Sequence, residues 1–247
     1  MFPHLLATLA SFLPSPVKYR FNGLKPAYAR LMRWGRSAVT INTPGGPLKW
    51  EIDELTSQRF ILGTYEPYMQ EAFSRFIRPG FTVYDVGAHA GYHSMLCGLL
   101  VGSGGQVISF EPNSTNRESI ERQIALNRHV NARVMPYALS DACQTSYLDT
   151  TAGGSQGFVS NYGDLAIELR TIDSLVRDQL LPLPDLIKID VEGHEEQVIR
   201  GALESIERNR PVILCDPNDS ETAFTVESLV APLGYKLTAT LPITLEP

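Results

Sequence analysis

From residue 82 to the end of the chain, short apolar runs alternate with longer amphipathic segments. The segments with strand character are 82–86, 105–110, 132–139, 187–191, 211–216 and 235–240, and those with helix character are 91–101, 115–128, 194–208 and 222–232. Strands that alternate with helices at this spacing predict an α/β fold: a doubly wound, mostly parallel sheet with helices on both faces. Right-handed crossovers place the carboxyl ends of such strands at one edge, where ligands bind.

Two regions depart from this alternation. Residues 40–65 hold the turn "NTPGGP" between two β-like runs, which predicts a small hairpin, and 67–78 fit an amphipathic helix that Pro79 and Gly80 end. Residues 140–185 include the glycine- and serine-rich "DTTAGGSQGFVSNYGD". Because a long insertion at the binding edge often serves function, we expect 140–185 to form a lid or substrate insertion, with a plain surface excursion as the alternative.

The stretch "VYDVGAHAGYHS" (83–94) joins a predicted strand to a predicted helix through Gly87 and Gly91. Glycines let the backbone approach a ligand closely, and the helix amino end offers free amides to an anion. A nicotinamide fingerprint needs a third glycine, which this loop lacks. Tyr92 would also crowd a pyrophosphate, so the loop suits a smaller anion such as an amino-acid carboxylate.

Glu111 ends the next predicted strand, 20 residues after Gly91. A carboxylate there can accept hydrogen bonds from both ribose hydroxyls, so loop and acid together predict a nucleoside ligand. This pair does not distinguish NAD from S-adenosylmethionine. Asp85 could hold the ammonium of a methionine moiety, and the amides of Ala138 and Leu139 together with Asp141 could contact an adenine edge.

The densest cluster of charge lies in "DLIKIDVEGHEEQVIRGA" (185–202). Strand alternation places Lys188, Asp190 and Glu192 on one side, and His194 opens the following helix. Charged groups at the end of a buried strand are costly unless they are used or paired. The structural alternative is a Lys–Asp ion pair together with a carboxylate at a helix amino end.

Taken together, "VYDVGAHAGYHS", "VISFEPN", "ALSD" and "DLIKIDVEGHEEQVIRGA" resemble the FkbM family of S-adenosylmethionine-dependent methyltransferases over roughly residues 60–235. The resemblance implies a class I, Rossmann-like methyltransferase fold of about seven strands. It also implies O-methylation of a hydroxyl on a sugar, glycan or natural product. A non-catalytic cofactor-binding or scaffold protein in glycan assembly is the alternative, and a nicotinamide oxidoreductase is disfavoured.

The resemblance and the residue patterns described above together give the cofactor-binding positions. They are Glu66 in "TYEP", the loop residues Asp85, Gly87, Ala88, His89, Gly91 and Tyr92, the ribose ligand Glu111 with Pro112 and Asn113 beside the adenine, Ala138, Leu139 and Asp190. Three positions depart from the family pattern: His89 replaces a usual asparagine, Asp216 a frequent glutamate, and little chain remains after "GYKL" for a final strand.

Methyl transfer to a hydroxyl needs a base, and the candidates are Asp190, Glu192 and His194, with Lys188 tuning the cluster. A divalent metal held by Asp190, Asp216 and Asn218 is a further alternative, which we do not expect.

Charge is distributed unevenly along the chain. Residues 1–50 contain seven of the 21 Lys and Arg residues and none of the 27 acidic ones. We divide the chain into a basic extension with a hairpin (1–60) and a cofactor-binding domain (61–247). The acidic domain argues against nucleic-acid binding. The basic extension could contact an anionic membrane face, cover its own domain or join a sister subunit in a homodimer.

The remaining composition favours a cytoplasmic protein. No run of 18 apolar residues predicts a membrane span, and no cation precedes the apolar amino-terminal stretch as in a secretory signal. The three cysteines, Cys97, Cys143 and Cys215, are far apart and fit buried thiols rather than disulfides or a zinc site.

Overall fold

The computed structural model describes residues 38–150, 157–160 and 162–247 of the 247-residue chain. The basic extension up to residue 37 lies outside the described residues, so the interpretations of it as a membrane-facing, self-covering or subunit-joining segment stay predictions. Within the described part of the chain, no helix is both long enough and apolar enough to cross a membrane.

A seven-stranded sheet forms the centre of the molecule, in the order β12-β13-β11-β10-β3-β4-β5. Its strands are β3 (Thr82–Val86), β4 (Gln106–Phe110), β5 (Ala132–Met135), β10 (Leu186–Ile189), β11 (Val212–Cys215), β12 (Lys236–Thr240) and β13 (Ile243–Glu246). The pairs among β11, β10, β3, β4 and β5 are parallel, whereas β13 lies antiparallel to both neighbours. The predicted seven-stranded, mostly parallel sheet is therefore confirmed.

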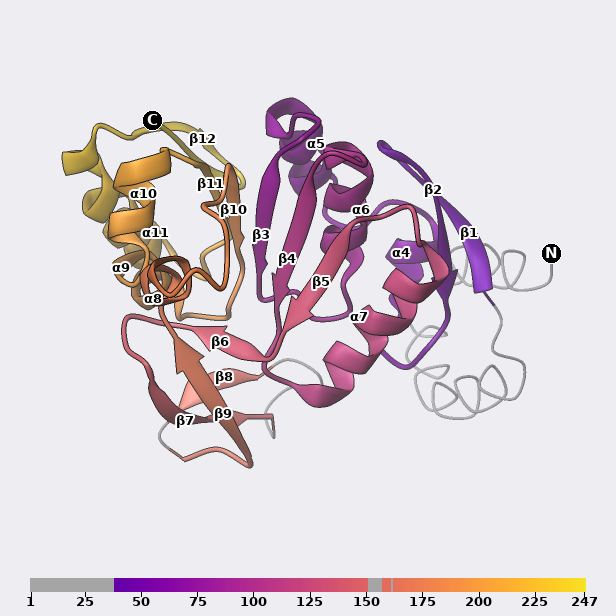
Figure 1. The fold of residues 1–247 in the computed structure, drawn as a ribbon, viewed down its shortest axis with the longest axis horizontal. Coiled ribbons are helices and arrows are strands. Elements are labelled where there is room, and N and C mark those ends of the chain that lie inside the picture. Colours follow the sequence, from indigo (N-terminus) through magenta and orange to yellow (C-terminus); the bar gives the residue numbers. More distant parts are fainter. Residues whose placement is uncertain (1–37, 151–156, 161) are drawn as a thin grey trace, which may run out of the picture.

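Helices cover both faces of this sheet. They are α4 (Gln58–Ile61), α5 (Pro67–Phe76), α6 (Tyr92–Val101), α7 (Ser114–Leu126), α8 (Ile172–Arg177), α9 (Glu195–Arg200), α10 (Leu203–Asn209) and α11 (Ser220–Val230), with a 3₁₀ turn η2 (Ala231–Leu233). In Figure 1, α8 to α11 lie on one side of the central strands and α4 to α7 on the other. Strand alternation explains the two cores: Tyr84 and Ile187 face the first group, and Val83 and Leu186 face the second.

A second sheet lies at the carboxyl ends of β4 and β5, below them in Figure 1. Its order is β6-β9-β7-β8, formed by β6 (Tyr137–Leu139), β7 (Gln144–Asp149), β8 (Phe158–Ser160) and β9 (Leu165–Arg170). The single strand predicted over 132–139 is therefore wrong. Pro136, which has no amide hydrogen for a ladder bond, separates β5 in the central sheet from β6 in this small sheet.

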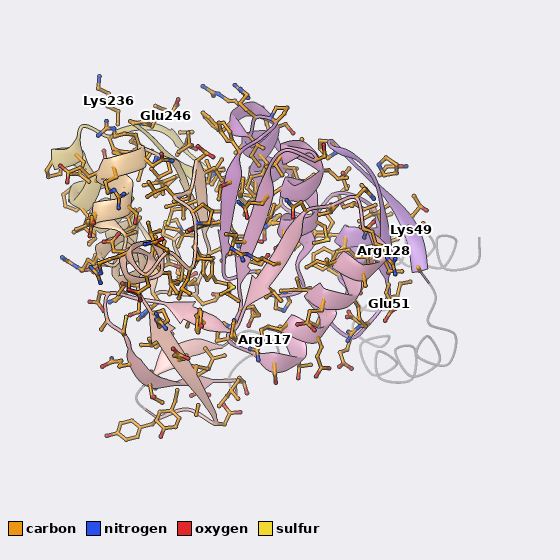
Figure 2. The ribbon with its side chains drawn as sticks, in the orientation of Figure 1. Lys49, Glu51, Arg117, Arg128, Lys236 and Glu246 are labelled. Carbon is orange, nitrogen blue, oxygen red and sulfur yellow. The ribbon has the colours of Figure 1, made fainter. Side chains whose placement is uncertain are left out.

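The predicted hairpin forms as β1 (Ala38–Thr43) and β2 (Gly46–Glu51). It lies against α7, whose side chains pair with its backbone: the Lys49 amide donates to Asn127 Oδ1 and the Glu51 amide to Gln123 Oε1, both at 2.9 Å. Figure 2 shows Lys49 and Glu51 beside Arg128 on this flank. The final hairpin, where Lys236 opposes Glu246, lies at the other end of the molecule.

Two further expectations concern the carboxyl-terminal half of the chain. The final strand is short, as the sequence suggested: β13 has four residues, of which Ile243 and Leu245 are buried, and it pairs with β11. The helix predicted over 194–208 is broken into α9 and α10 at Gly201. A Cβ added at Gly201 would lie 1.9 Å from the Ser140 carbonyl oxygen, so this junction packs directly on the end of β6.

Candidate functional site

The loop after β3 holds an unusual backbone. Gly87, His89 and Gly91 have φ values of 78°, 50° and 83°, a region that few side chains tolerate. The amides of Gly87 and Ala88 both donate to the Phe110 carbonyl at 3.2 Å, which ties the loop to the end of β4. At Gly87 a Cβ would lie 1.8 Å from the Asp190 carbonyl oxygen, so only glycine allows the loop to pack against the end of β10.

Glu111 lies in the angle between this loop and the start of α7. Its Oε2 accepts the His89 amide at 2.8 Å and its Oε1 accepts the Asn113 amide at 2.9 Å. Burial raises the pKa of Glu111 to about 7, although these two hydrogen bonds oppose the shift. The Asn116 side chain is a third hydrogen-bond donor to this carboxylate, so one of its roughly four acceptor sites is left for a ribose hydroxyl.

Asn113 and Arg117 stabilise this corner. Asn113 caps α7 by accepting the Thr115 amide at 2.9 Å, and Arg117 Nη1 donates to the carbonyls of Glu111 and Pro112. Figure 2 shows Arg117 at the lower end of α7, close to the small sheet.

A buried ion pair lies beneath the loop. Lys188 Nζ is 3.1 Å from Asp85 Oδ1 and 3.5 Å from Asp190 Oδ2, and it donates to the Gly87 carbonyl at 3.0 Å. Ser94 also donates to Asp85 Oδ2 at 2.5 Å. Burial alone would raise the pKa of Asp85, but the Lys188 ammonium outweighs it and the pKa lies below its usual value. Both side chains are therefore charged.

Glu66 immediately precedes α5, as its N-cap residue. Its φ of 41° turns the chain into Pro67, the first residue of the helix. Its Oε2 is buried with no hydrogen-bond partner among the described residues, 3.5 Å from Nε2 of the buried His93. Burial raises the pKa of Glu66 and lowers that of His93 to about 3, so the imidazole is neutral. An orphaned carboxylate oxygen of this kind can accept an ammonium group.

Acidic groups follow β10 and β11. Glu192 has a φ of 55°, and burial followed by the charge of Asp190 raises its pKa. Asp216, at the end of β11, accepts a hydrogen bond from the Tyr68 hydroxyl at 2.8 Å. In the described ranges, no three side chains of the His, Cys, Asp and Glu types form a group that could hold a metal ion.

His194 caps the start of α9 and contacts the end of β6. Its Nε2 lies 2.9 Å from Ser140 Oγ, and the Ser140 hydroxyl donates to Asp141 Oδ1 at 3.2 Å. Burial lowers the pKa of His194, opposed by the charge of Asp141, so the imidazole is neutral near pH 7.

A cavity of about 320 Å³ lies between the loop after β3, the ends of β4 and β10, and the small sheet. Of the sequence-predicted residues it brings together Gly87, His89, Glu111, Pro112, Ala138, Leu139, Asp190, Glu192 and His194. The other predicted residues do not line the cavity. Asp85 and Lys188 lie beneath the loop after β3, Ala88 and Gly91 lie within that loop, and Tyr92 follows it directly. Asn113 caps α7, and Glu66 lies behind the cavity. Tyr65, which the sequence interpretation gave only as part of the "TYEP" element, also lines it, as do Asn116, Tyr137, Leu148 and Val159, which that interpretation did not assign to the site.

Some of these omissions had a detectable signal. Tyr65 precedes Glu66 directly, and Asn116 lies one turn into the helix after Glu111, where its side chain hydrogen-bonds that carboxylate. Leu148 and Val159 reach the cavity only because the small sheet folds over the edge of the central one, which no local pattern indicates.

The strand order, the antiparallel β13 beside β11 and the loop followed by Glu111 define a class I, Rossmann-like methyltransferase fold. A family model described as the methyltransferase FkbM domain matches residues 85–237, more than half of the chain. The chain belongs to the FkbM methyltransferase family.

Similarity to individual proteins is lower. The hexuronic acid methyltransferase AglP of Haloferax volcanii is 28% identical over 146 residues, which cover 56% of this chain and 58% of that protein. The chain thus spans less than two thirds of this relative. Among solved structures, the precorrin-6y C5,15-methyltransferase of Geobacter metallireducens GS-15 gives a TM-score of 0.47 at 16% identity, covering 73% of this chain and 76% of that one. The methyltransferase FkbM of Methylobacillus flagellatus KT gives 0.45 at 18% identity, covering 72% and 48%.

Proposed function

We propose that this protein transfers a methyl group from S-adenosylmethionine to a hydroxyl of a sugar or glycan. The observation that carries the proposal is that one cavity joins Glu111, a ribose-type carboxylate, to Asp190, Glu192 and His194. Cofactor-type and base-type groups thus line a single space of a size typical of small-molecule sites.

The residues present fit the cofactor. Glu111 retains acceptor capacity for a ribose hydroxyl, and Phe110 and Leu139 supply apolar lining beside it. Glu66 Oε2 lacks a hydrogen-bond partner among the described residues, but Glu66 lies behind the cavity and does not line the space where the methionine ammonium would lie. Asp85, which the sequence suggested for that ammonium, is already paired with Lys188. When bound, S-adenosylmethionine supplies an electrophilic methyl group on a positively charged sulfur.

The chain's own groups then serve the acceptor. Alignment of the acceptor oxygen with the methyl group is mainly a proximity effect, to which a preformed cavity contributes. Of the lining groups that can take a hydroxyl proton, we assign Asp190, Glu192 and His194 to the acceptor, since His89 and Glu111 belong to the cofactor loop and its ribose contact. Lys188 holds Asp190 and the Gly87 carbonyl in place, which is a positioning role.

The charge of the cavity favours a hydroxyl over a carboxylate as acceptor. Among the described residues that line it, none is Lys or Arg, while Asp190 and Glu192 supply negative charge. The relative named as a hexuronic acid methyltransferase supports a sugar as the substrate class. The small sheet contributes Leu148 and Val159 to the cavity wall, and we assign these two side chains to the acceptor side.

Two measurements test the proposal. Calorimetry with S-adenosylmethionine and S-adenosylhomocysteine should show binding that Glu111→Ala abolishes or weakens strongly, and no binding by the wild type would refute it. Labelled methyl transfer over a panel of sugars and lipid-linked glycans should then give a labelled product. Cofactor binding without transfer to any acceptor would favour the alternative of a non-catalytic scaffold.

A further inference from the structure

Ser140, Asp141 and His194 come from distant parts of the chain and meet beside the cavity. Ser140 follows β6 and is 2% exposed, whereas His194 precedes α9 and lines the cavity. His194 Nε2 is 2.9 Å from Ser140 Oγ, and the Ser140 hydroxyl donates to Asp141 Oδ1 at 3.2 Å.

The backbone holds Ser140 firmly. Its amide donates to the Arg170 carbonyl at 2.9 Å, and its own carbonyl lies against Gly201, where a Cβ would approach within 1.9 Å. Ser140 is therefore fixed between β9 and the junction of α9 and α10. A hydroxyl so placed can orient a neighbouring imidazole.

The direction of these hydrogen bonds determines the tautomer of His194. A serine hydroxyl has one proton, and the Asp141 carboxylate, which can only accept, attracts that proton more strongly than a neutral imidazole nitrogen does. Ser140 Oγ must then accept from His194, so Nε2 carries the ring proton. In a neutral imidazole the other nitrogen, Nδ1, is the unprotonated one. Nδ1 has no hydrogen-bond partner among the described residues.

We infer that Ser140 and Asp141 are positioning residues that hold His194 as its Nε2-protonated tautomer, so that Nδ1 is the base for the acceptor hydroxyl. The inference rests on the proposed methyl transfer, because it assigns the base of that reaction. The rival groups are engaged elsewhere: Asp190 contacts Lys188 at 3.5 Å, and the Glu192 side chain hydrogen-bonds Asn218.

The proton balance of the step is complete. The acceptor oxygen forms a bond to the methyl carbon, and the electron pair of the broken carbon–sulfur bond stays with the neutral thioether that leaves. The hydroxyl proton passes to His194 Nδ1, which makes the ring an imidazolium while Nε2–H remains bonded to Ser140. Solvent then removes the extra proton.

The tautomer can be measured without knowing the acceptor. Long-range proton–nitrogen NMR of the full chain with ¹⁵N-labelled histidine rings, bound to S-adenosylhomocysteine, distinguishes protonated from unprotonated ring nitrogens. The chain has five histidines, and His194→Gln identifies the signals of His194. We expect Nε2 protonated and Nδ1 unprotonated in the wild type.

Substitutions should then change this preference in a defined order. Ser140→Ala and Asp141→Ala should raise the population with the proton on Nδ1, whereas Ser140→Thr, which keeps the hydroxyl, should preserve the wild-type state. Ser146→Ala is the matched control, since this buried serine of the small sheet donates to the Ser160 carbonyl and does not line the cavity. A proton on Nδ1 in the wild type, or a preference unchanged in Ser140→Ala, overturns the inference. Asp141 is exposed, so Asp141→Ala provides the test if Ser140→Ala does not fold.

Kinetics connect the tautomer to the reaction. Ser140→Ala should lower kcat by about ten- to a hundredfold, which is no more than removal of the general base itself would cost. The affinity for S-adenosylhomocysteine should stay unchanged. Ser140→Thr should restore most of the rate. A wild-type protein that methylates no acceptor would refute the proposed function but leave the tautomer assignment standing, so the two failures are distinguishable. An unchanged kcat in both Ser140→Ala and His194→Gln would remove His194 as the base.

Discussion

His89 has a left-handed backbone conformation in the middle of the cofactor loop, with φ at 50°. Asparagine and histidine enter this region far more easily than β-branched residues. The same geometry explains why an asparagine is usual here in the family that the sequence resembles. We expect His89→Asn to keep cofactor binding and stability close to wild type, and His89→Val to cost about 1–2 kcal/mol of the free energy of unfolding. Chemical denaturation measures the free energy of unfolding of the two variants, and calorimetry measures their cofactor binding. His129→Val, at an exposed turn position without a positive φ, is the control, and equal losses for the two valine variants would contradict the argument.

Glu111 gives the site a pH dependence. Its pKa in the folded protein is about 7, above the ordinary value for a glutamate, because it is buried. It therefore stabilises the fold below the unfolded pKa, and this stabilisation is lost as pH rises through 7. Ribose hydroxyls donate to the ionised form of Glu111. Cofactor affinity should therefore rise with pH, whereas the stability contribution of Glu111 falls.

The expected result is an S-adenosylhomocysteine affinity that rises up to about tenfold between pH 6 and pH 8, as the carboxylate ionises. Glu111→Gln should bind more weakly and lose this part of the pH dependence. Calorimetry at pH 6, 7 and 8 measures both proteins. Parallel pH profiles for the wild type and Glu111→Gln would exclude Glu111 as the source.

Sequence predicts single residues well where one local motif contains both the residue and its partners. Gly87 and Glu111 were identified because a glycine loop and an acid at the next strand end occur at a fixed spacing. The contacts of Glu66 with His93 and of Ser140 with His194 join segments far apart in the chain, and no local spacing indicates them.

At the scale of elements, the loop after β3 must pass close to the end of β10. Gly87→Ala adds both left-handed strain and a Cβ 1.8 Å from the Asp190 carbonyl oxygen. Gly102→Ala adds strain alone, because φ of 65° with ψ of −169° is a region essentially restricted to glycine and nothing lies within 4 Å of its Cβ position. We expect a loss of about 1–3 kcal/mol for Gly102→Ala, and for Gly87→Ala a loss larger by about 1–3 kcal/mol because the overpacking adds to the strain. Urea denaturation measures the difference, and equal losses would contradict the close packing.

The small sheet provides the second prediction at this scale. Val159→Trp should narrow the acceptor side of the cavity and raise the KM for the acceptor about tenfold, equivalent to ~1.4 kcal/mol, without changing S-adenosylhomocysteine affinity. Tyr147→Trp is the control, because Tyr147 is 42% exposed and does not line the cavity. Weaker cofactor binding with an unchanged acceptor KM in Val159→Trp would place the small sheet on the cofactor side instead.

Elements were predictable where periodicity and length agree, and less so where tertiary packing decides. The strands of the central sheet alternate with helices of ordinary length, so their order could be read directly. The division of 132–139 between two sheets, and the break between α9 and α10, depend on Pro136 and on the close approach of Gly201 to Ser140. The short final strand, Ile243–Glu246, pairs with β11, which lies distant in sequence, so no local pattern could indicate this pairing.

For the whole molecule, the parallel strands bring their carboxyl ends to one edge, and the small sheet closes over that edge. The resulting cavity has negative charge on one side and carries no Lys or Arg among its described lining residues. A neutral hydroxyl acceptor suits this environment, because a carboxylate would be repelled by Asp190 and Glu192.

The most direct test is transfer of a labelled methyl group from S-adenosylmethionine to matched sugars that differ only in a hydroxymethyl or a carboxylate group. We predict labelled product from the neutral sugar, with a label that resists alkaline hydrolysis because it is an ether. Label that alkali removes, as from a methyl ester, would show that a carboxylate is the acceptor and would contradict hydroxyl methylation at this cavity.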